Sequence, residues 1–325
     1  MEISIVIGII GIVVLIILMI CGMHIAFALG LTGLAGIIVF SGWEAGLNSA
    51  GYSPFTWLNN YHLAVLPLFM LMGYFAFYAG IANDVFETAK KWLGSFPGGL
   101  PIATALGNAA FAACSGAGGA TAAVFTKVSL PPMEAAGIDR TLAVGTIAAS
   151  GTLAALIPPS GLIVIYGLFA EQSIGKLLIA GIIPGIISVL IYSGGIFARC
   201  SINPKLAPRQ PSYSWKQRLY SLKYTWPVLV IFFLILGGIY TGIFTPTEAG
   251  GVGAAGVFLI ALSMRRLSLS KIRTASIETG SMMIMVFALF IGAKFFLCFM
   301  ALSGITESLT TWVLSLQVSR YIILA

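Results

Sequence analysis

Charged side chains are scarce in this sequence. Asp, Glu, Lys and Arg make up 8% of its 325 residues, whereas soluble domains carry about 25%. Hydrophobic residues reach 59%, and the mean hydropathy is +1.02. Such a chain has too few polar side chains to cover a surface that faces water, which excludes a soluble enzyme and a disordered protein. We therefore expect an all-α polytopic membrane protein that lies in a lipid bilayer.

The residue types that catalyse reactions or bind metals are also few. The sequence has 2 histidines and contains neither HExxH nor GxSG, so an intramembrane hydrolase lacks its nucleophile, base or metal ligands. The 4 cysteines have no CxxC spacing. We expect no enzymatic activity and no tightly bound cofactor. The cysteines are Cys21, Cys114, Cys200 and Cys298.

Positive charge is confined to short loops between apolar runs. Lys and Arg number 17 against 10 Asp and Glu, a net charge of +7. Three loops carry most of the cations: Lys90 and Lys91; Arg199, Lys205, Arg209, Lys216, Arg218 and Lys223; Arg265, Arg266, Lys271 and Arg273. The positive-inside rule places these loops in the cytoplasm and Met1 outside, provided that residues 100–133 do not cross the membrane. Cations in short loops form no basic surface for a nucleic acid.

The apolar runs predict the membrane spans, since a spanning helix needs about 20 apolar residues. The predicted spans are Ile3–Cys21, His24–Phe40, Tyr61–Gly80, Thr141–Phe169, Leu177–Ala198, Trp226–Phe244, Ala249–Met264, Thr279–Met300 and Thr310–Ala325. Between two of them lies SYSWKQRLYSLKYT, in which Trp215, Leu219 and Leu222 share one helical face. We expect an interfacial helix on the cytoplasmic leaflet there; an ordinary cationic connector is the alternative.

Small residues dominate the stretch from Pro97 to Pro132. Between Ala103 and Thr126, 19 of 24 residues are Ala, Gly, Ser, Thr or Cys. Residues 100–133 number 34, too few for two spans of about 20 residues plus a turn, and CSGAGG is too turn-prone for one helix. We predict a re-entrant hairpin with its break at Ser115–Gly119, because irregular backbone inside a membrane survives where protein buries it. A kinked packing helix is the alternative.

A second break follows in AASGTLAALIPPSGLIVIYG. Pro158 and Pro159 remove helix hydrogen bonds in mid-span and free backbone carbonyls. A hairpin followed by a discontinuous helix is typical of the binding site of a secondary transporter. Carbonyl and hydroxyl oxygens there suit a hard cation such as sodium, and the N-terminus of a half-helix suits an anion.

Charged residues elsewhere favour structural roles. We expect Asp84 and Glu87 to pair with Lys90 and Lys91 at helical spacings. The TPTE sequence at Thr245–Glu248 predicts a helix start with Pro in the first turn. Lys294 falls inside a predicted span, where a lysine is a functional candidate unless it snorkels or pairs with Glu307.

Four motifs follow one another along the chain: LPLFMLMGYF, FAACSGAGGATAAVF, the run from Gly151 through IPPSGLIVIYG to SIGKLLIAGIIPG, and GGIYTGIFTPTEAG. Together they resemble the DctM-like large permease subunit of tripartite ATP-independent periplasmic (TRAP) transporters. The resemblance implies an elevator-type ion-transporter fold in the bacterial inner membrane. It also implies sodium-driven import of an organic anion such as a C4-dicarboxylate or a sialic-acid-like sugar acid. The implied partners are a small four-helix membrane subunit and a periplasmic solute receptor.

The same resemblance assigns the sodium and substrate region to the two breaks. Its residues are Ser115, Gly116, Gly118, Gly119, Thr121, Gly151, Thr152, Pro158, Pro159 and Ser160. We divide the chain into scaffold helices (1–98), a transport-domain half (99–198), a cytoplasmic arm (199–225) and an incomplete second repeat (226–325). No second Gly-rich tip or Pro-Pro break follows residue 251, so we expect the second inverted repeat to be truncated. The alternatives are a carrier that needs no receptor and an inactive fragment.

Overall fold

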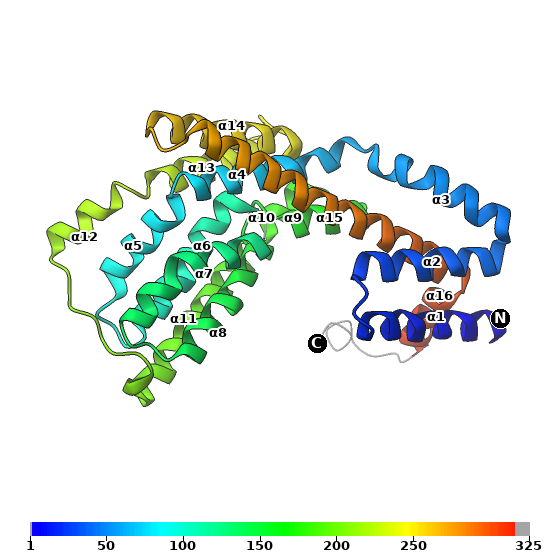
Figure 1. Cartoon of the computed structure of the whole chain (residues 1–325), viewed down its shortest axis with the longest axis horizontal. Coiled ribbons are helices and arrows are strands. Elements are labelled where there is room, and N and C mark those ends of the chain that lie inside the picture. The colour runs from blue at the N-terminus through cyan, green and yellow to red at the C-terminus, as the bar shows by residue number, and fades with distance from the viewer. Residues whose placement is uncertain (1, 117, 316–325) are drawn as a thin grey trace. The chain divides into compact units, whose positions relative to one another are not determined.

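All regular secondary structure in the described part of the chain is helical. The computed structural model describes residues 2–116 and 118–315 (Figure 1). These residues confirm the predicted all-α class. The chain divides into two compact units, Met1–Asn60 with Ser281–Ala325, and Tyr61–Gly280.

The first unit packs its helices through glycines. It comprises α1 (Glu2–Ile20), α2 (Ile25–Ser41), α3 (Trp43–Leu58), the C-terminal part of α15 (Leu269–Leu302) and α16 (Ile305–Ser315). A Cβ atom at Gly33 of α2 would overlap the Phe295 backbone of α15, and one at Gly36 would overlap the Phe299 ring. Glycine at both positions therefore lets α15 lie directly on α2. Lys294 of α15 lies 5.9 Å from the centroid of the Phe290 ring.

The second unit contains the hairpin and the broken helix. Its helices α6, α7, α8 and α11 pack side by side (Figure 1), and α14 lies along α4. Its elements are η1 (Tyr61–Ala64), α4 (Val65–Tyr78), α5 (Ile81–Leu93), α6 (Gly99–Ser115), α7 (Gly118–Ala135), α8 (Arg140–Gly151), η2 (Thr152–Ala155), α9 (Gly161–Phe169), α10 (Ile174–Ala180), α11 (Ile182–Ile202), η3 (Pro204–Leu206), α12 (Trp215–Leu222), α13 (Trp226–Tyr240), α14 (Pro246–Ser263) and the start of α15.

Several segments are long and apolar enough to span a membrane. Within the described residues there are 5 by length and composition, or 6 if α12 and α13, which meet at 43°, form one bent span. The five are Ile3–Ile20, Tyr61–Tyr78, Ile174–Ile202, Pro246–Ser263 and Leu269–Leu302. They overlap predicted spans, although α15 extends beyond Thr279–Met300 at both ends. The predicted span Thr310–Ala325 meets α16 as far as Ser315, and the rest lies outside the described residues.

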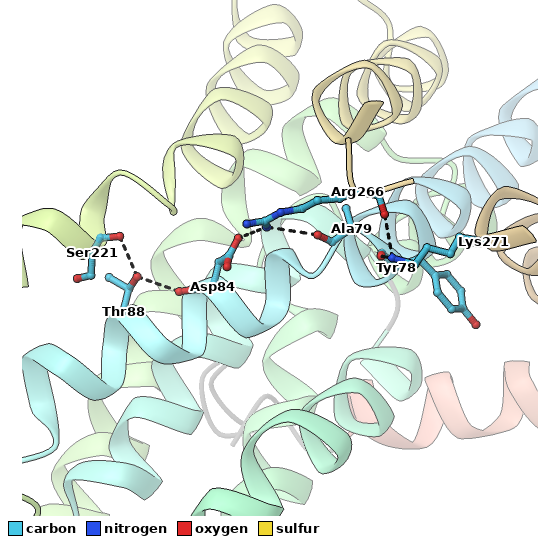
Figure 2. A network of polar contacts seen from close by, with 7 residues as sticks. All are labelled: Tyr78, Ala79, Asp84, Thr88, Ser221, Arg266 and Lys271. Atoms are coloured by element: carbon cyan, nitrogen blue, oxygen red, sulfur yellow. Dashed lines mark hydrogen bonds and ion pairs between the residues drawn. The ribbon is translucent and has the colours of Figure 1, made fainter. Parts of the chain in front are cut away.

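The second and third cation-rich loops both contact α5, the helix whose last turn carries Lys90 and Lys91. Arg266, between α14 and α15, forms an ion pair with Asp84 of α5 (Figure 2). The N–H of Gln210, in the second loop, donates to the Gly94 carbonyl at 3.1 Å, directly after α5. These contacts join the third loop to the first turn of α5 and the second loop to the residue after its end, and the common cytoplasmic side stays a prediction. Our prediction that Asp84 pairs with a lysine of its own helix was wrong, whereas Glu87 does pair with Lys90 at 3.2 Å.

Further hydrogen bonds join α4, α5 and α12 to neighbouring segments. The Lys271 ammonium donates to the Tyr78 carbonyl at 3.1 Å and to the Arg266 carbonyl at 2.8 Å (Figure 2). The Thr88 hydroxyl is bonded to the Ser221 carbonyl of α12 at 3.1 Å. The bond from Lys271 gives the last carbonyl of α4 a partner, and the bond from Thr88 joins α5 to α12.

The segment predicted as an interfacial arm is helical. α12 begins with a capping box in which Ser214 and Gln217 exchange side-chain and backbone hydrogen bonds. Trp215, Leu219 and Leu222 are 68%, 58% and 45% exposed. A helix with an exposed apolar face matches the predicted interfacial helix, and its contact with a membrane stays a prediction.

Candidate functional site

The Gly-rich stretch forms two helices joined by a break. α6 ends at Ser115, and Gly116 takes a left-handed conformation (φ +61°) that glycine adopts at little cost. The Phe111 and Phe125 rings, one from each helix, lie 6.0 Å apart, so α7 returns along α6. The predicted break is therefore confirmed. Residue 117, inside it, lies outside the described residues.

Both ends of the hairpin lie against the same connector. Before α6, the Gly94 carbonyl accepts a hydrogen bond from the Gln210 N–H at 3.1 Å. After α7, the Asp139 N–H donates to the Leu206 carbonyl at 2.8 Å. The chain thus enters the hairpin and leaves it at the same end of the unit, as a re-entrant path requires.

Two hydroxyls meet at the hairpin tip. The oxygens of Ser115 and Thr121 are 2.7 Å apart, and the two residues are 2% and 0% exposed. Helix α4 approaches the tip through Gly73, where a Cβ atom would lie 2.8 Å from the Ser115 backbone. The LPLFMLMGYF motif therefore contributes a contact at the tip that sequence reasoning missed; the glycine within that motif was the available signal.

The second predicted break also occurs where expected. α8 ends at Gly151, a short 3-10 turn follows, and α9 begins at Gly161. Ser160 caps α9, because its hydroxyl accepts from the Ile163 N–H at 3.4 Å and donates to the Ala155 carbonyl at 2.7 Å. Pro158 and Pro159 are buried in the interruption. Buried irregular backbone of this kind needs such partners.

The structure brings the two breaks together. The Gly161 N–H donates to the Gly116 carbonyl at 2.7 Å, which joins the start of α9 to the hairpin tip. A Cβ atom at Gly116 would lie 3.3 Å from the Pro159 carbonyl oxygen, and one at Gly151 would lie 2.6 Å from the Cβ of Ala122. The sequence places Gly161 beside the predicted Pro158–Pro159 break, but the predicted site residues do not include it.

The predicted site residues do not all share this junction. Thr152 is exposed, and its hydroxyl bonds to the Ala149 carbonyl at 2.6 Å and lies 3.3 Å from the Tyr192 hydroxyl. Gly118 and Gly119 form the first turn of α7. Ser115, Gly116, Thr121, Gly151, Pro158, Pro159 and Ser160 are buried around the two breaks.

The polar groups of the junction are neutral. They are hydroxyls and backbone carbonyls, and in the described part of the chain no group of three His, Cys, Asp or Glu side chains could hold a metal ion. The Gly116 carbonyl keeps a second lone pair beside its bond to Gly161. This oxygen set fits a hard cation better than a transition metal, which prefers nitrogen and sulfur ligands.

Elsewhere, the predicted start of α14 is confirmed. The Glu248 N–H donates to the Thr245 hydroxyl at 3.3 Å, and the Thr245 N–H donates to the Glu248 carboxylate at 2.8 Å. Pro246 occupies the first turn, as the TPTE sequence predicts.

Apolar spans around a hairpin and an interrupted helix define a multi-pass membrane protein organised like a secondary transporter. Comparison with known proteins makes this specific. The family described as "Tripartite ATP-independent periplasmic transporter, DctM component" matches residues 12–325, and this chain belongs to it. The family is one of transporter permeases, and the resemblance seen in the four motifs is thereby confirmed.

Individual relatives are longer than the part of them that this chain matches. The chain is 34% identical to a C4-dicarboxylate TRAP transporter large permease of Pseudomonas aeruginosa, over 91% of this chain and 69% of that protein. It is 36% identical to the Vibrio cholerae protein of the same description, over 75% of this chain and 53% of that protein. It is 30% identical to the Rhodobacter capsulatus protein of that description, over 95% of this chain and 73% of that protein. The chain thus spans between half and three quarters of these relatives.

Proposed function

We propose that this chain is a sodium-coupled permease subunit that imports an organic anion across the bacterial inner membrane. The bond between the Gly161 N–H and the Gly116 carbonyl carries the proposal, because it joins two helix interruptions inside one buried junction. Discontinuous helices of this kind form the substrate and ion sites of secondary transporters.

The chemistry of the junction supports both ligands. Sodium would be held by neutral oxygens, for which Ser115, Thr121 and the Gly116 carbonyl are the candidates. A carboxylate would be attracted to the N-terminal ends of α7 and α9, where the helix dipole places partial positive charge. The elevator-type movement implied by the family resemblance would carry this junction across the membrane.

The substrate class and the partners are proposed from the relatives. Three relatives are named for C4-dicarboxylates, and others for sialic acid, isethionate and ectoine. We therefore propose an organic acid, with C4-dicarboxylates tested first. The tripartite description supports two partners, a small four-helix membrane subunit and a periplasmic solute receptor.

The test is uptake into proteoliposomes that contain this permease together with the small membrane subunit, with the receptor and radiolabelled succinate outside. We expect uptake to need an inward sodium gradient and the receptor. Replacing Thr121 by Val removes the hydroxyl next to Ser115 while keeping the side-chain shape, and should lower uptake at least tenfold. Thr126→Val is the matched control, because Thr126 is an exposed threonine of the same helix bonded to the Ala122 carbonyl.

Three results would contradict the proposal. Uptake that does not depend on the sodium gradient would exclude sodium as the coupling ion. Uptake without the receptor favours a receptor-independent carrier. Equal loss in the Thr121→Val and Thr126→Val variants assigns the effect to helix α7 as a whole rather than to the tip.

A further inference from the structure

The segment from Arg199 to Thr225, which contains α12, holds nearly the whole positive charge of the protein. It has 6 Lys or Arg and no Asp or Glu, whereas the rest of the chain carries 11 cations and 10 acids. The positive-inside rule counts Lys and Arg, and acids contribute little to it, so topology alone does not explain why this segment lacks acids. Attraction to a negatively charged surface depends on net charge and does explain it.

The cations of this segment are not neutralised by acids from other parts of the fold. The ion pairs of the described residues join cations and acids outside it: Lys90 with Glu87, Arg140 with Glu134, and Arg266 with Asp84. Within the segment, Lys216 on α12 and Lys223 at its C-terminal end are both exposed. These ammonium groups are therefore accessible to an anion from outside the chain.

Contacts with α5 hold α12 in place. The Trp92 indole of α5 donates to the Arg218 carbonyl at 3.2 Å, and the Thr88 hydroxyl is bonded to the Ser221 carbonyl. Ser221 is buried. The backbone of α12 is thus fixed on a buried neighbour, and its orientation does not depend on the groups that it exposes.

The apolar side of α12 is among the exposed surfaces. Trp215, Leu219 and Leu222 lie four and three residues apart, so they share one face of the helix, and all three are exposed. An exposed apolar face with cations beside it is typical of helices that lie in the interface of a membrane, with the apolar side chains at the acyl boundary.

Two of the cations lie against aromatic rings beside that face. The Lys223 ammonium is 3.5 Å from the centroid of the Tyr220 ring and 4.8 Å from that of the Tyr224 ring. The Arg218 guanidinium is 5.3 Å from the centroid of the Trp215 ring. Trp and Tyr are enriched at the level of lipid headgroups, and Lys and Arg reach that level by laying their stems along apolar surface. Cations held in this way lie at the depth of the lipid phosphates.

We propose that α12 and its flanking residues bind anionic phospholipids of the leaflet that they face. The apolar side chains lie at the acyl boundary, and Lys216, Arg218 and Lys223 bind the phosphates. A zwitterionic phospholipid fits the apolar face but not the excess of cations, and a soluble phosphate leaves the apolar face uncovered. The surface contains none of the ten predicted site residues, and the inference does not rest on the proposed function.

The test measures phospholipid binding to the chain purified in detergent, by native mass spectrometry. Phosphatidylglycerol should bind roughly tenfold more tightly than phosphatidylcholine. Because each Lys or Arg near an anionic surface strengthens binding roughly fivefold, Lys216→Gln combined with Lys223→Gln should weaken phosphatidylglycerol roughly tenfold or more and leave phosphatidylcholine unchanged. Leu219→Gln removes apolar contact without a change of charge and should weaken both lipids.

A matched double variant separates this surface from a general charge effect. Arg265→Gln combined with Arg273→Gln removes two exposed cations from the third cation-rich loop and should leave phosphatidylglycerol binding unchanged. All the substituted side chains are exposed, so each variant should fold, and melting curves check this. Neither excess inorganic phosphate nor the small membrane subunit should displace phosphatidylglycerol.

Several results would overturn the proposal. It is wrong if the two lipids bind equally, if both double variants lose phosphatidylglycerol to the same extent, or if Leu219→Gln leaves both affinities unchanged. Displacement by inorganic phosphate would assign the cations to a soluble anion. Displacement by the small membrane subunit would make the exposed face of α12 a protein interface instead.

Discussion

Replacing Gly116 by Ala should destabilise the protein in two ways. The left-handed backbone at Gly116 (φ +61°) costs a residue with a Cβ atom about 1–2 kcal/mol. That Cβ would also lie 3.0 Å from the Cβ of Phe69 and 3.3 Å from the Pro159 carbonyl oxygen. Phe69 is 1% exposed and has little room to move, so crowding adds about 1–3 kcal/mol.

Gly242→Ala isolates the backbone contribution. Gly242 also has a positive φ (+74°), but a Cβ atom there would meet nothing within 4 Å. At roughly 3 °C per kcal/mol, Gly116→Ala should lower the melting temperature by roughly 10 °C and Gly242→Ala by roughly 4–5 °C. The assay is thermal unfolding of both variants in the same detergent. Equal decreases would refute the argument that Phe69 and Pro159 confine the hairpin tip.

Three further substitutions test the packing. Asp84→Asn should lower the free energy of unfolding by about 1–3 kcal/mol, because it leaves the half-buried Arg266 without its partner. Glu87→Gln, at the more exposed pair with Lys90, should lower it by at most about 1 kcal/mol. Melting curves of the two variants in the same detergent test the difference. Thr245→Ala removes the cap of α14 and should lower the free energy of unfolding by about 1 kcal/mol. The helical circular dichroism signal should then be lost at a lower temperature on heating. An unchanged melting curve would contradict the role of the capping box. Phe125→Ala leaves a cavity at a fully buried position and should lower the free energy of unfolding by about 3–5 kcal/mol, measured by chemical denaturation. A decrease below about 1 kcal/mol would mean that the hairpin helices do not pack as described.

Local features of the sequence predicted most of the helices and both interruptions. Apolar length sets the spans, and Pro158 and Pro159, which remove helix hydrogen bonds in mid-span, predicted the second interruption. The Gly/Ala-rich composition and the shortness of residues 100–133 together indicated a hairpin. α3 was missed because Trp43–Leu58 mixes polar and apolar residues and contains Pro54. Such a segment lacks the long apolar run on which the span prediction relied.

Long-range pairings could not be predicted in the same way. The rule for neighbouring charges on a helix covers pairs three or four residues apart, which fits Glu87 and Lys90, whereas the partner of Asp84 is Arg266 from a loop far along the chain. The bond between Gly161 and Gly116 likewise depends on how α9 packs against the hairpin. Sequence indicated which residues interrupt helices, and tertiary packing decides which of those interruptions touch.

The connector between α11 and α12, which contacts both ends of the hairpin, is synthesised after the hairpin itself. Leu206 and Gln210 are synthesised after both hairpin helices, and they supply the partners of Asp139 and Gly94. A nascent chain that stops at the end of α11 therefore contains the complete hairpin without the two hydrogen bonds that fasten its ends. Those two bonds can therefore form only after the segment that precedes α12 has been synthesised, whereas the contacts between α6 and α7 need no later residue.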